Sequence, residues 1–284
     1  MTEVFEESGR LDEAERAARL FTGGLVIFRQ QVEAFDLLET AQAIIAEAFA
    51  PHDPLTAHRE LGDDEFGARA EALVADYEKS PEIAARFATL LEAVGVDSAT
   101  TGWDRLRLRI QPPEGSYRSR RVQTLALHRD SWGSGILAQV NWWAPIHPVS
   151  AARTMALYPD YFGRAIANGS AQWDFDELRR RLRAGDDSYP LLPALLEPVD
   201  ENGAWPMLIA PGDLLAFAAV HLHGSIANET ALVRYSTEVR TVGRGDLAAG
   251  RAAPNVDTAT PRLSYDWFHS IADSKLLGEA ERRS

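Results

Sequence analysis

The sequence predicts a mostly β fold, a jelly roll or antiparallel barrel preceded by a helical N-terminal part. Apolar residues recur at helical spacing through the first hundred residues, whereas from Trp103 onward they alternate with a period of two. No linker or low-complexity tract separates the two parts. We therefore expect one domain over residues 1–284, with mainly helical support in 1–100, a β core in 103–242 and a C-terminal extension in 243–284.

The N-terminal part is expected to contain four helices and one strand. Helical spacing covers residues 11–20, 33–49, 64–78 and 81–94. The last of these begins with Pro81, a residue favoured in the first turn of a helix. Between the first two helices lies the apolar, β-branched run GLVIFR, residues 24–29, which predicts a buried strand.

The second part is expected to consist mainly of strands. Alternating or apolar runs cover residues 105–110, 123–128, 136–143, 152–158 and 231–242. The run 207–219 predicts two short strands about a Pro-Gly turn, and 174–184 predicts a helix. In RLRLRI the arginines Arg105, Arg107 and Arg109 share one face, which we expect to be exposed to solvent.

Composition excludes several classes of function. The chain has 42 Asp and Glu residues against 29 Lys and Arg, a formal net charge of −13, which argues against an electrostatic nucleic-acid binder. It has no cysteine, so disulfides, thiolate metal sites and cysteine nucleophiles are excluded. It has neither a signal-peptide core nor an apolar run that could span a membrane. We expect a cytoplasmic protein that acts on a small molecule.

A His-x-Asp pattern ends the expected strand 123–128. In LALHRDSWGSG, His128 and Asp130 would share one face of an extended chain, where both side chains can bind one ion. A second pattern, His58 followed by Glu60, lies in a stretch expected to be a solvated helix or loop. Residues two apart in a helix point about 200° apart. We therefore expect only the first pair to bind a metal.

The C-terminal strands contain the remaining candidates. His221 and His223 follow an apolar run, and Arg234 and Ser236 come eleven and thirteen residues after His223. Two histidines and one aspartate can form the facial triad that binds ferrous iron in non-haem oxygenases and leaves positions open for co-substrates. A guanidinium can bind a carboxylate through two parallel hydrogen bonds.

This combination resembles the Fe(II)/2-oxoglutarate-dependent oxygenases, and within them the phytanoyl-CoA dioxygenase-like branch. The similar stretches lie within about residues 103–242 and include HRDSW, QVNWWAPIHPV, MALYPDYF, PGDLLAF, HLHGSIAN and RYSTEVRTV. The resemblance implies a double-stranded β-helix (a cupin-like jelly roll) flanked by helices, with Fe(II) bound by His128, Asp130 and His223. It also implies 2-oxoglutarate and dioxygen as co-substrates. His221 is an alternative ligand, but the family's ten-residue gap before the arginine favours His223.

The resemblance assigns Arg234 and Ser236 to 2-oxoglutarate, which would place their strand face inside the barrel. Arg240 shares that face and is a candidate for substrate binding or for an ion pair with Glu238. We assign Asn141 to 2-oxoglutarate as well.

Further substrate candidates are Gln139 and Trp143, on the same strand face as Asn141, and Trp132, for which packing is the alternative. The polar segment 159–206 is the expected lid, and its tryptophans and arginines permit either an aromatic or an anionic substrate.

The implied reaction is the oxidative decarboxylation of 2-oxoglutarate to succinate and CO2, coupled to hydroxylation of an unactivated C–H bond in a small molecule, for example one of secondary metabolism. Asp130 argues against halogenation, because halogenating relatives have a small residue there. Desaturation, cyclisation and epimerisation share the early steps. The alternatives are a cupin-like metal-dependent isomerase or epimerase that does not use 2-oxoglutarate, and a barrel that binds without catalysis.

Overall fold

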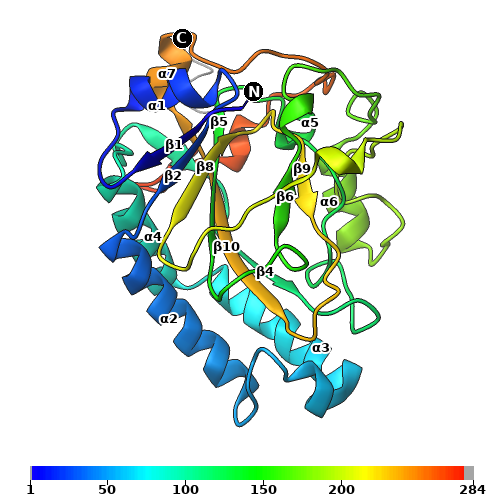
Figure 1. Ribbon diagram of the computed structural model, residues 1–284. Helices are drawn as coiled ribbons and strands as arrows, with labels where there is room; N and C mark the ends of the chain where they lie inside the picture. Colours follow the sequence, from blue (N-terminus) through cyan, green and yellow to red (C-terminus); the bar gives the residue numbers. More distant parts are fainter. Residues whose placement is uncertain (1, 278–284) are drawn as a thin grey trace.

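The computed structural model describes residues 2–277, which form two β-sheets with helices packed mainly on one side (Figure 1). Along the larger sheet the strands follow the order β1 (Val4–Glu7), β2 (Leu25–Phe28), β8 (Leu214–Ala218), β5 (Gln139–Pro145), β10 (Arg234–Gly243), β3 (Thr101–Trp103) and β11 (His269–Ser270), and β4 (Arg107–Gln111) also pairs with β10. The smaller sheet has the order β7 (Trp205–Pro206), β6 (Met155–Leu157) and β9 (His223–Ser225).

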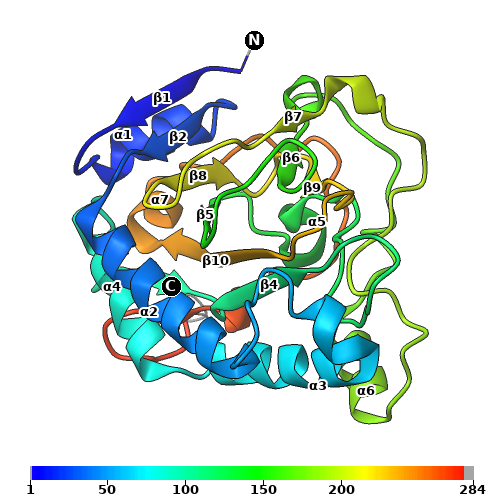
Figure 2. The same ribbon diagram turned by 60° about the horizontal axis from the view of Figure 1, so that its bottom comes forward.

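Helices α2 (Val32–Phe49), α3 (His58–Tyr77) and α4 (Pro81–Ala93) cover the outer side of the larger sheet near β10 and β4, as Figure 2 shows. Helix α1 (Glu13–Leu20) instead lies beside β2. Later in the chain follow α5 (Asp130–Ser134), α6 (Phe175–Arg183), α7 (Arg244–Ala248) and the 3₁₀ turns Pro159–Tyr161, Glu201–Gly203 and Tyr265–Trp267.

Local chemistry explains where the helices begin and which faces they bury. The Asp12 carboxylate accepts hydrogen bonds from the first turn of α1, and the Ser80 hydroxyl does the same for α4, where Pro81 follows. In α2 the buried residues recur every three or four positions, from Leu37 to Ile45. Each fully buried Leu or Ile of such a stripe contributes roughly 1.5–3 kcal/mol, so this packing fixes the helices against the sheet.

Strand β10 separates the apolar core from the interior between the sheets. It pairs with β5 and with β4, and its residues alternate between two faces. Tyr235 and Val239 belong to the core shared with the helices, whereas Arg234, Glu238 and Arg240 line a cavity on the other face. Arg234 therefore lies on the interior face of β10, as expected.

Asp213 anchors the turn that precedes β8. Its carboxylate accepts hydrogen bonds from the backbone N–H of Gln30 (3.0 Å) and of Ala210 (3.0 Å), and it pairs with Arg29 at 2.7 Å. Burial opposes its ionisation, but the hydrogen bonds from Gln30 and Arg29 outweigh this and hold the pKa of Asp213 below its usual value. At Gly212 φ is +96°, a conformation that favours glycine.

Several expected strands differ from the structure. Segment 123–128 is not a regular strand, because only scattered backbone hydrogen bonds, such as those between His128 and His223, join it to β9. Of the two strands expected in 207–219, only β8 forms. The short strands β1, β3, β7 and β11 were not expected, since two to four residues give too little periodicity to recognise.

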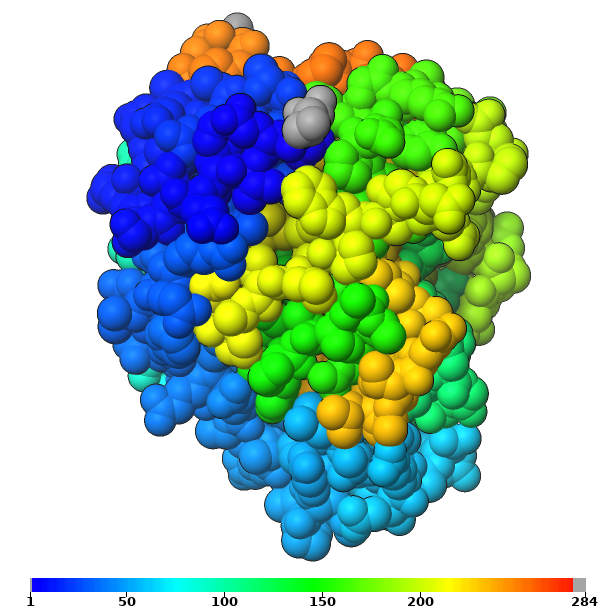
Figure 3. Space-filling view, viewed as in Figure 1, coloured from blue at the N-terminus to red at the C-terminus, as the bar shows by residue number. Residues whose placement is uncertain are grey.

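Both ends of the described chain add to the larger sheet. In Figure 3 the N-terminal segment, in dark blue, lies against the yellow segment around residues 205–215, and Val4 packs against a cluster that includes Met207 and Ile209. Strand β11 lies within the expected C-terminal extension, of which residues 278–284 fall outside the described residues. Between residues 2 and 277 no helix combines the length and apolar character needed to cross a bilayer.

Candidate metal and co-substrate site

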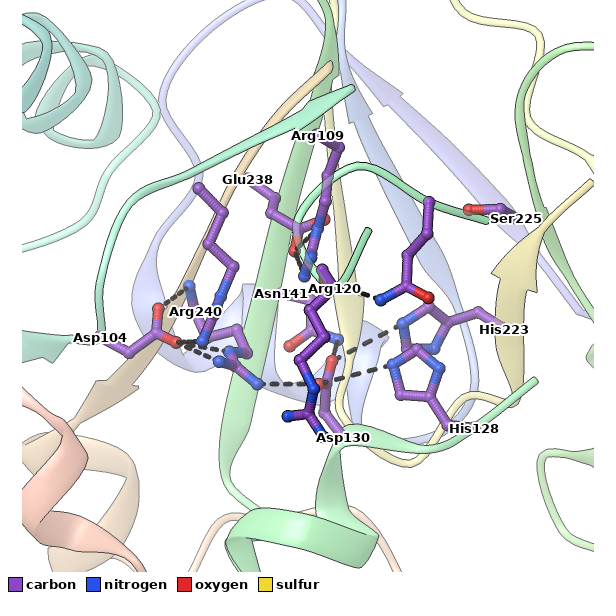
Figure 4. A network of polar contacts seen from close by, with 12 residues as sticks. Asp104, Arg109, Arg120, His128, Asp130, Asn141, His223, Ser225, Glu238 and Arg240 are labelled. Atoms are coloured by element: carbon purple, nitrogen blue, oxygen red, sulfur yellow. Dashed lines mark hydrogen bonds and ion pairs between the residues drawn. The ribbon is translucent and has the colours of Figure 1, made fainter. Parts of the chain in front are cut away.

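His128, Asp130 and His223 converge between the two sheets, as Figure 4 shows. Nε2 of His128 lies 3.8 Å from Oδ1 of Asp130, and Nε2 of His223 lies 3.7 Å from Oδ2. Both distances are shorter than the ~4.2 Å that two metal–ligand bonds of about 2.1 Å can span. Within residues 2–277 no other group of three or more His, Asp or Glu side chains converges in this way.

The backbone brings these residues together at a change of structure. His128 exchanges two backbone hydrogen bonds with His223, at 2.9 and 3.0 Å, which places the imidazoles side by side. Arg129 is still extended, and α5 begins at Asp130. The expectation that His128 and Asp130 lie on one strand was therefore wrong, because they stand on either side of a transition from extended chain to helix.

Both imidazoles are oriented for binding a metal through Nε2. Nδ1 of His128 is 2.8 Å from the carbonyl oxygen of Ala126, and Nδ1 of His223 is 2.9 Å from that of His221. Because a carbonyl only accepts, each Nδ1 carries the hydrogen, which leaves the Nε2 lone pair facing Asp130. Burial, and then the neighbouring His223, lower the pKa of His128 to about 4, so this imidazole is neutral at pH 7.

The Asp130 carboxylate is held at both oxygens. Oδ2 accepts a hydrogen bond from Nδ2 of Asn141 at 2.6 Å, and Oδ1 accepts one from Nη1 of Arg240 at 2.9 Å. Burial alone would raise the pKa of Asp130, but the positive charge of Arg240 and the nearby histidines outweigh it and hold the pKa below its usual value. The carboxylate is therefore a charged and oriented ligand. Gln139 is buried behind it and donates to Asn141 at 2.9 Å.

Arg240 is fixed by a second acidic residue, Asp104, which the sequence did not single out. Nε of Arg240 donates to Oδ2 of Asp104 at 2.6 Å, and Nη2 also pairs with this carboxylate. Glu238 instead accepts two hydrogen bonds from Arg109, at 2.6 and 2.8 Å. The expected pair of Arg240 with Glu238 was thus wrong. The pairing of β3 with β10 brings Asp104 next to Arg240. The sequence near Asp104 contains no pattern from which this strand register could be predicted.

Arg234 and Ser236 supply buried donors that lack acceptors. Arg234 is 4% exposed; its Nη2 donates to the hydroxyl of Ser225 at 3.2 Å, but Nε and Nη1 have no hydrogen-bond partner among the described residues. The buried hydroxyl of Ser236 also lacks one there. Burial lowers the pKa of Arg234 to about 10, so the guanidinium stays charged at pH 7. Buried polar groups nearly always have hydrogen-bond partners. The unpartnered donors of Arg234 and Ser236 therefore indicate a site for an anionic ligand.

The triad, Arg234 and Asn141 line one cavity of about 860 Å³, whereas the buried residues Ser236 and Gln139 do not line it. Among the expected substrate residues, Trp143 and Arg240 line it. Trp132 does not line it: this side chain is fully buried and donates through Nε1 to Asp257 at 2.7 Å, which is the packing alternative.

The arginines of β4 were expected to face solvent, but two of them face the cavity. Arg107 and Arg109 line the cavity, so the expectation of a solvent-exposed face was wrong for them. The expected lid segment contributes Trp173, Phe175 and Arg179 to the cavity wall. The sequence could not reveal which side of β4 faces inward, because alternation shows only which residues share a face.

The other histidines lie outside the triad. His221 places Nδ1 3.1 Å from the carbonyl oxygen of Ala218 and Nε2 3.3 Å from that of Gly23, so neither nitrogen faces Asp130. The second His-x-acid pattern lies on α3, where Glu60 contacts Nδ1 of His52 at 2.8 Å rather than converging with His58.

No family model matches the chain, and no curated protein matches it. Similar solved structures include ThoJ, described as a non-heme monooxygenase, with 18% identity over 80% of this chain and 76% of that chain and a TM-score of 0.43. SnoK, a non-heme alpha-ketoglutarate-dependent carbocyclase from nogalamycin biosynthesis, has 16% identity over 89% and 95% and a TM-score of 0.40. EvdO2 from Micromonospora carbonacea var. aurantiaca, solved with 2-oxoglutarate, has 15% identity over 84% and 94% and a TM-score of 0.44. These likenesses are remote, so function is inferred below from the side chains of this chain.

Proposed function

We propose that this protein is an Fe(II)- and 2-oxoglutarate-dependent dioxygenase that hydroxylates an unactivated C–H bond of a small molecule, and that its two sheets form a double-stranded β-helix. One observation carries the proposal. A triad of two imidazoles and a charged carboxylate shares a cavity with a buried guanidinium whose Nε and Nη1 lack partners among residues 2–277. The first set suits Fe(II), and the second suits the distal carboxylate of a 2-oxo acid.

The donors of the triad fit ferrous iron. Nε2 of His128, Nε2 of His223 and one oxygen of Asp130 would hold it and leave positions for two co-substrates. When bound, the iron supplies the activation of dioxygen, whose two oxygen atoms end in succinate and in the hydroxylated product while 2-oxoglutarate loses CO2. The protein's part is to hold the reactants in place and to keep water out of the cavity.

Each chain residue near the triad has a distinct task in this proposal. Arg234 binds the distal carboxylate of 2-oxoglutarate through Nε and Nη1, and Ser236 donates a further hydrogen bond. Asn141 and Arg240 keep the Asp130 carboxylate in a fixed orientation, because each donates to a different oxygen. Trp143 adds an apolar wall beside the reacting groups.

We also propose that residues 1–284 form a single oxygenase domain. Strand β2 of the N-terminal part pairs with β8 of the core, and β11 of the C-terminal extension pairs with β3. Both pairings extend the sheet that contains β10, which supports a common fold rather than separate units.

Anaerobic titration tests the proposed function. Fe(II) is added to metal-free protein, and 2-oxoglutarate is then titrated while the visible absorption of the iron-bound 2-oxo acid is followed. We expect a saturable 1:1 complex that fails to form in His128→Ala, and that forms normally in His58→Ala, the matched control on α3. A protein that binds Fe(II) but gives no complex with 2-oxoglutarate would favour the cupin-like isomerase or epimerase instead.

A further inference from the structure

The cavity is rich in positive charge although the protein is acidic. The whole chain has a formal net charge of −13, yet nine arginines and five acidic residues line the cavity. An acidic protein that gathers arginines in one concave site raises the local concentration of anions there. Part of this positive charge would be neutralised by the acidic residues of the cavity and by bound 2-oxoglutarate.

The ionisable cavity residues of β4 and β10, together with the two aspartates that pair with Arg240, leave one positive charge in excess. They are Arg107, Arg109, Arg234, Arg240, Glu238, Asp104 and Asp130. Arg129 adds no excess, because it pairs with Asp257. A histidine that binds a metal does so as the neutral imidazole, so the two histidines of the triad add no charge when iron is bound. Ferrous iron and the doubly charged 2-oxoglutarate cancel each other, so the excess persists when both are bound. Buried charge without a partner is costly, which implies a further anion.

Arg107 holds the excess charge. The carboxylate of Asp104 lies 3.6 Å from its Nη2 but is already bound by Arg240 at 2.6 Å. Nε of Arg107 is buried and has no hydrogen-bond partner within the described chain. Burial, and then the charge of Arg240, lower the pKa of Arg107 to about 10, which leaves it protonated at pH 7.

Arg120 offers a second free donor to the same cavity. Its Nε pairs with Asp187 at 3.0 Å and its Nη2 donates to backbone carbonyls, but Nη1 is buried without a partner among residues 2–277. Arg120 lines the cavity together with Arg107 and the triad.

An aromatic wall accompanies these arginines. Trp173, Phe175 and Trp267 line the cavity, and the rings of Phe175 and Trp267 lie 4.3 Å apart between centroids. The indole N–H of Trp267 is buried and finds no acceptor in the part of the chain that the structure describes. The wall thus offers apolar surface together with one hydrogen-bond donor.

We propose that the substrate is an organic anion whose carboxylate or phosphate binds Arg107 and Arg120, while its apolar body lies along Trp173, Phe175 and Trp267. This rests on the proposed oxygenase function and names the class of molecule that the site accepts. The sequence permitted either an aromatic or an anionic substrate, and this proposal names a substrate that is anionic at one end and apolar or aromatic over the rest.

Fluorine NMR with a series of probes that share a 4-fluorophenyl body and differ in the charged group tests the charge preference. The probes are 4-fluorophenylacetate, 4-fluorobenzyl phosphate, neutral 4-fluorophenylacetamide and cationic 4-fluorophenethylamine. Each is titrated into the full chain loaded anaerobically with Fe(II) and saturating 2-oxoglutarate. We expect at least one anion to bind about 10- to 100-fold more tightly than the amide, and the amine not to bind. The tighter of the two anions identifies the oxyanion that the site prefers.

Variants locate the binding group. Arg107→Met should bring the affinity for the anion down to that for the amide, and Arg120→Met should weaken it less. Arg180→Met is the matched control: Arg180 neighbours the cavity residue Arg179 on α6, but it is exposed and paired with Glu177. It should leave binding unchanged. Equal binding of anion and amide by the wild type, or no anion binding at millimolar concentration, overturns the inference even if the Met variants misfold.

The same samples separate this inference from the proposed function. In Arg107→Met the complex of iron with 2-oxoglutarate should form with unchanged affinity while anion binding falls. Loss of 2-oxoglutarate binding in this variant would make Arg107 the co-substrate anchor and overturn the inference. If the wild type forms no such complex, the oxygenase proposal fails, and the probe series on metal-free protein still decides whether Arg107 binds an organic anion.

Discussion

Replacing Arg234 by alanine tests the proposed co-substrate site most directly. The guanidinium is 4% exposed, and Nε and Nη1 are free to form two parallel hydrogen bonds to a carboxylate. Truncation removes both bonds and leaves the carboxylate of 2-oxoglutarate in a desolvated pocket without its counter-charge. Such a loss costs about 2–5 kcal/mol, or a roughly 30- to 4000-fold weaker affinity for 2-oxoglutarate.

Two further variants should weaken the affinity for 2-oxoglutarate by smaller amounts. Arg234→Lys should recover only part of the affinity, because an ammonium group cannot form the planar two-bond contact. Ser236→Ala removes one neutral hydrogen bond and should cost about 0.5–1.5 kcal/mol, or roughly 2- to 13-fold. Fe(II) affinity should stay close to that of the wild type in all three, because neither residue contributes a ligand atom to the triad.

The assay combines two readouts. Anaerobic titration of the Fe(II)-loaded proteins gives the dissociation constant for 2-oxoglutarate. Thermal unfolding then shows whether 2-oxoglutarate stabilises the fold, since a ligand at 100 times its dissociation constant adds about 2.7 kcal/mol. In Arg234→Ala at the same concentration this stabilisation should fall to about 0.9 kcal/mol or less, because an affinity weakened at least 30-fold leaves the ligand at no more than about three times its dissociation constant. Unchanged affinity for 2-oxoglutarate in a folded alanine variant would refute the reasoning.

Three other sets of substitutions test the metal ligands, the support of Asp130 and the turn before β8. His128→Ala and Asp130→Ala should each abolish tight Fe(II) binding in a metal-binding titration, while His58→Ala should bind Fe(II) like the wild type; tight binding by both triad variants would contradict the site. Asn141→Ala should lower Fe(II) affinity about 10- to 100-fold because it positions Asp130, with a smaller change for 2-oxoglutarate; the reverse ratio would make Asn141 a co-substrate residue. Asp213→Asn should lower the free energy of unfolding by about 2–4 kcal/mol at pH 7. The pKa of Asp213 in the folded protein lies below its usual value. The stability that the ionised carboxylate adds to the fold is therefore present above about pH 4 and is lost as the pH falls through the folded pKa. In denaturant titrations, the difference in the free energy of unfolding between wild type and variant should shrink in acid.

Local signals account for the elements that the sequence predicted well. Pro81 after Ser80 predicts the start of α4, and the apolar spacing from Leu37 to Ile45 predicts α2, because helix termini and faces depend on neighbouring residues. The triad was predicted from the His-x-Asp pattern together with the family resemblance, whose ten-residue gap before the arginine favoured His223 over His221. The reasoning about a strand face was nevertheless wrong, because a helix begins at Asp130.

Features that depend on strand pairing could not be predicted. Asp104 reaches Arg240 only because β3 and β10 pair, and these residues are far apart in the sequence. Likewise, Arg109 contacts Glu238 across the pairing of β4 with β10. Alternation predicted that Arg107 and Arg109 share a face, but the face that becomes interior depends on where the helices pack, and they cover the opposite side of β4.

The interior face of β10 shows why unpaired charges identify binding sites in this fold. Glu238 is satisfied by Arg109, and Arg240 is satisfied by Asp104 and Asp130, so neither needs a ligand to offset its burial. Arg234, on the same face, forms no ion pair with a carboxylate and has no acceptor for Nε and Nη1 within residues 2–277. A buried ion costs several kcal/mol unless it is paired. We therefore propose that a bound anion completes the pairing of this guanidinium, which lines the same cavity as the triad.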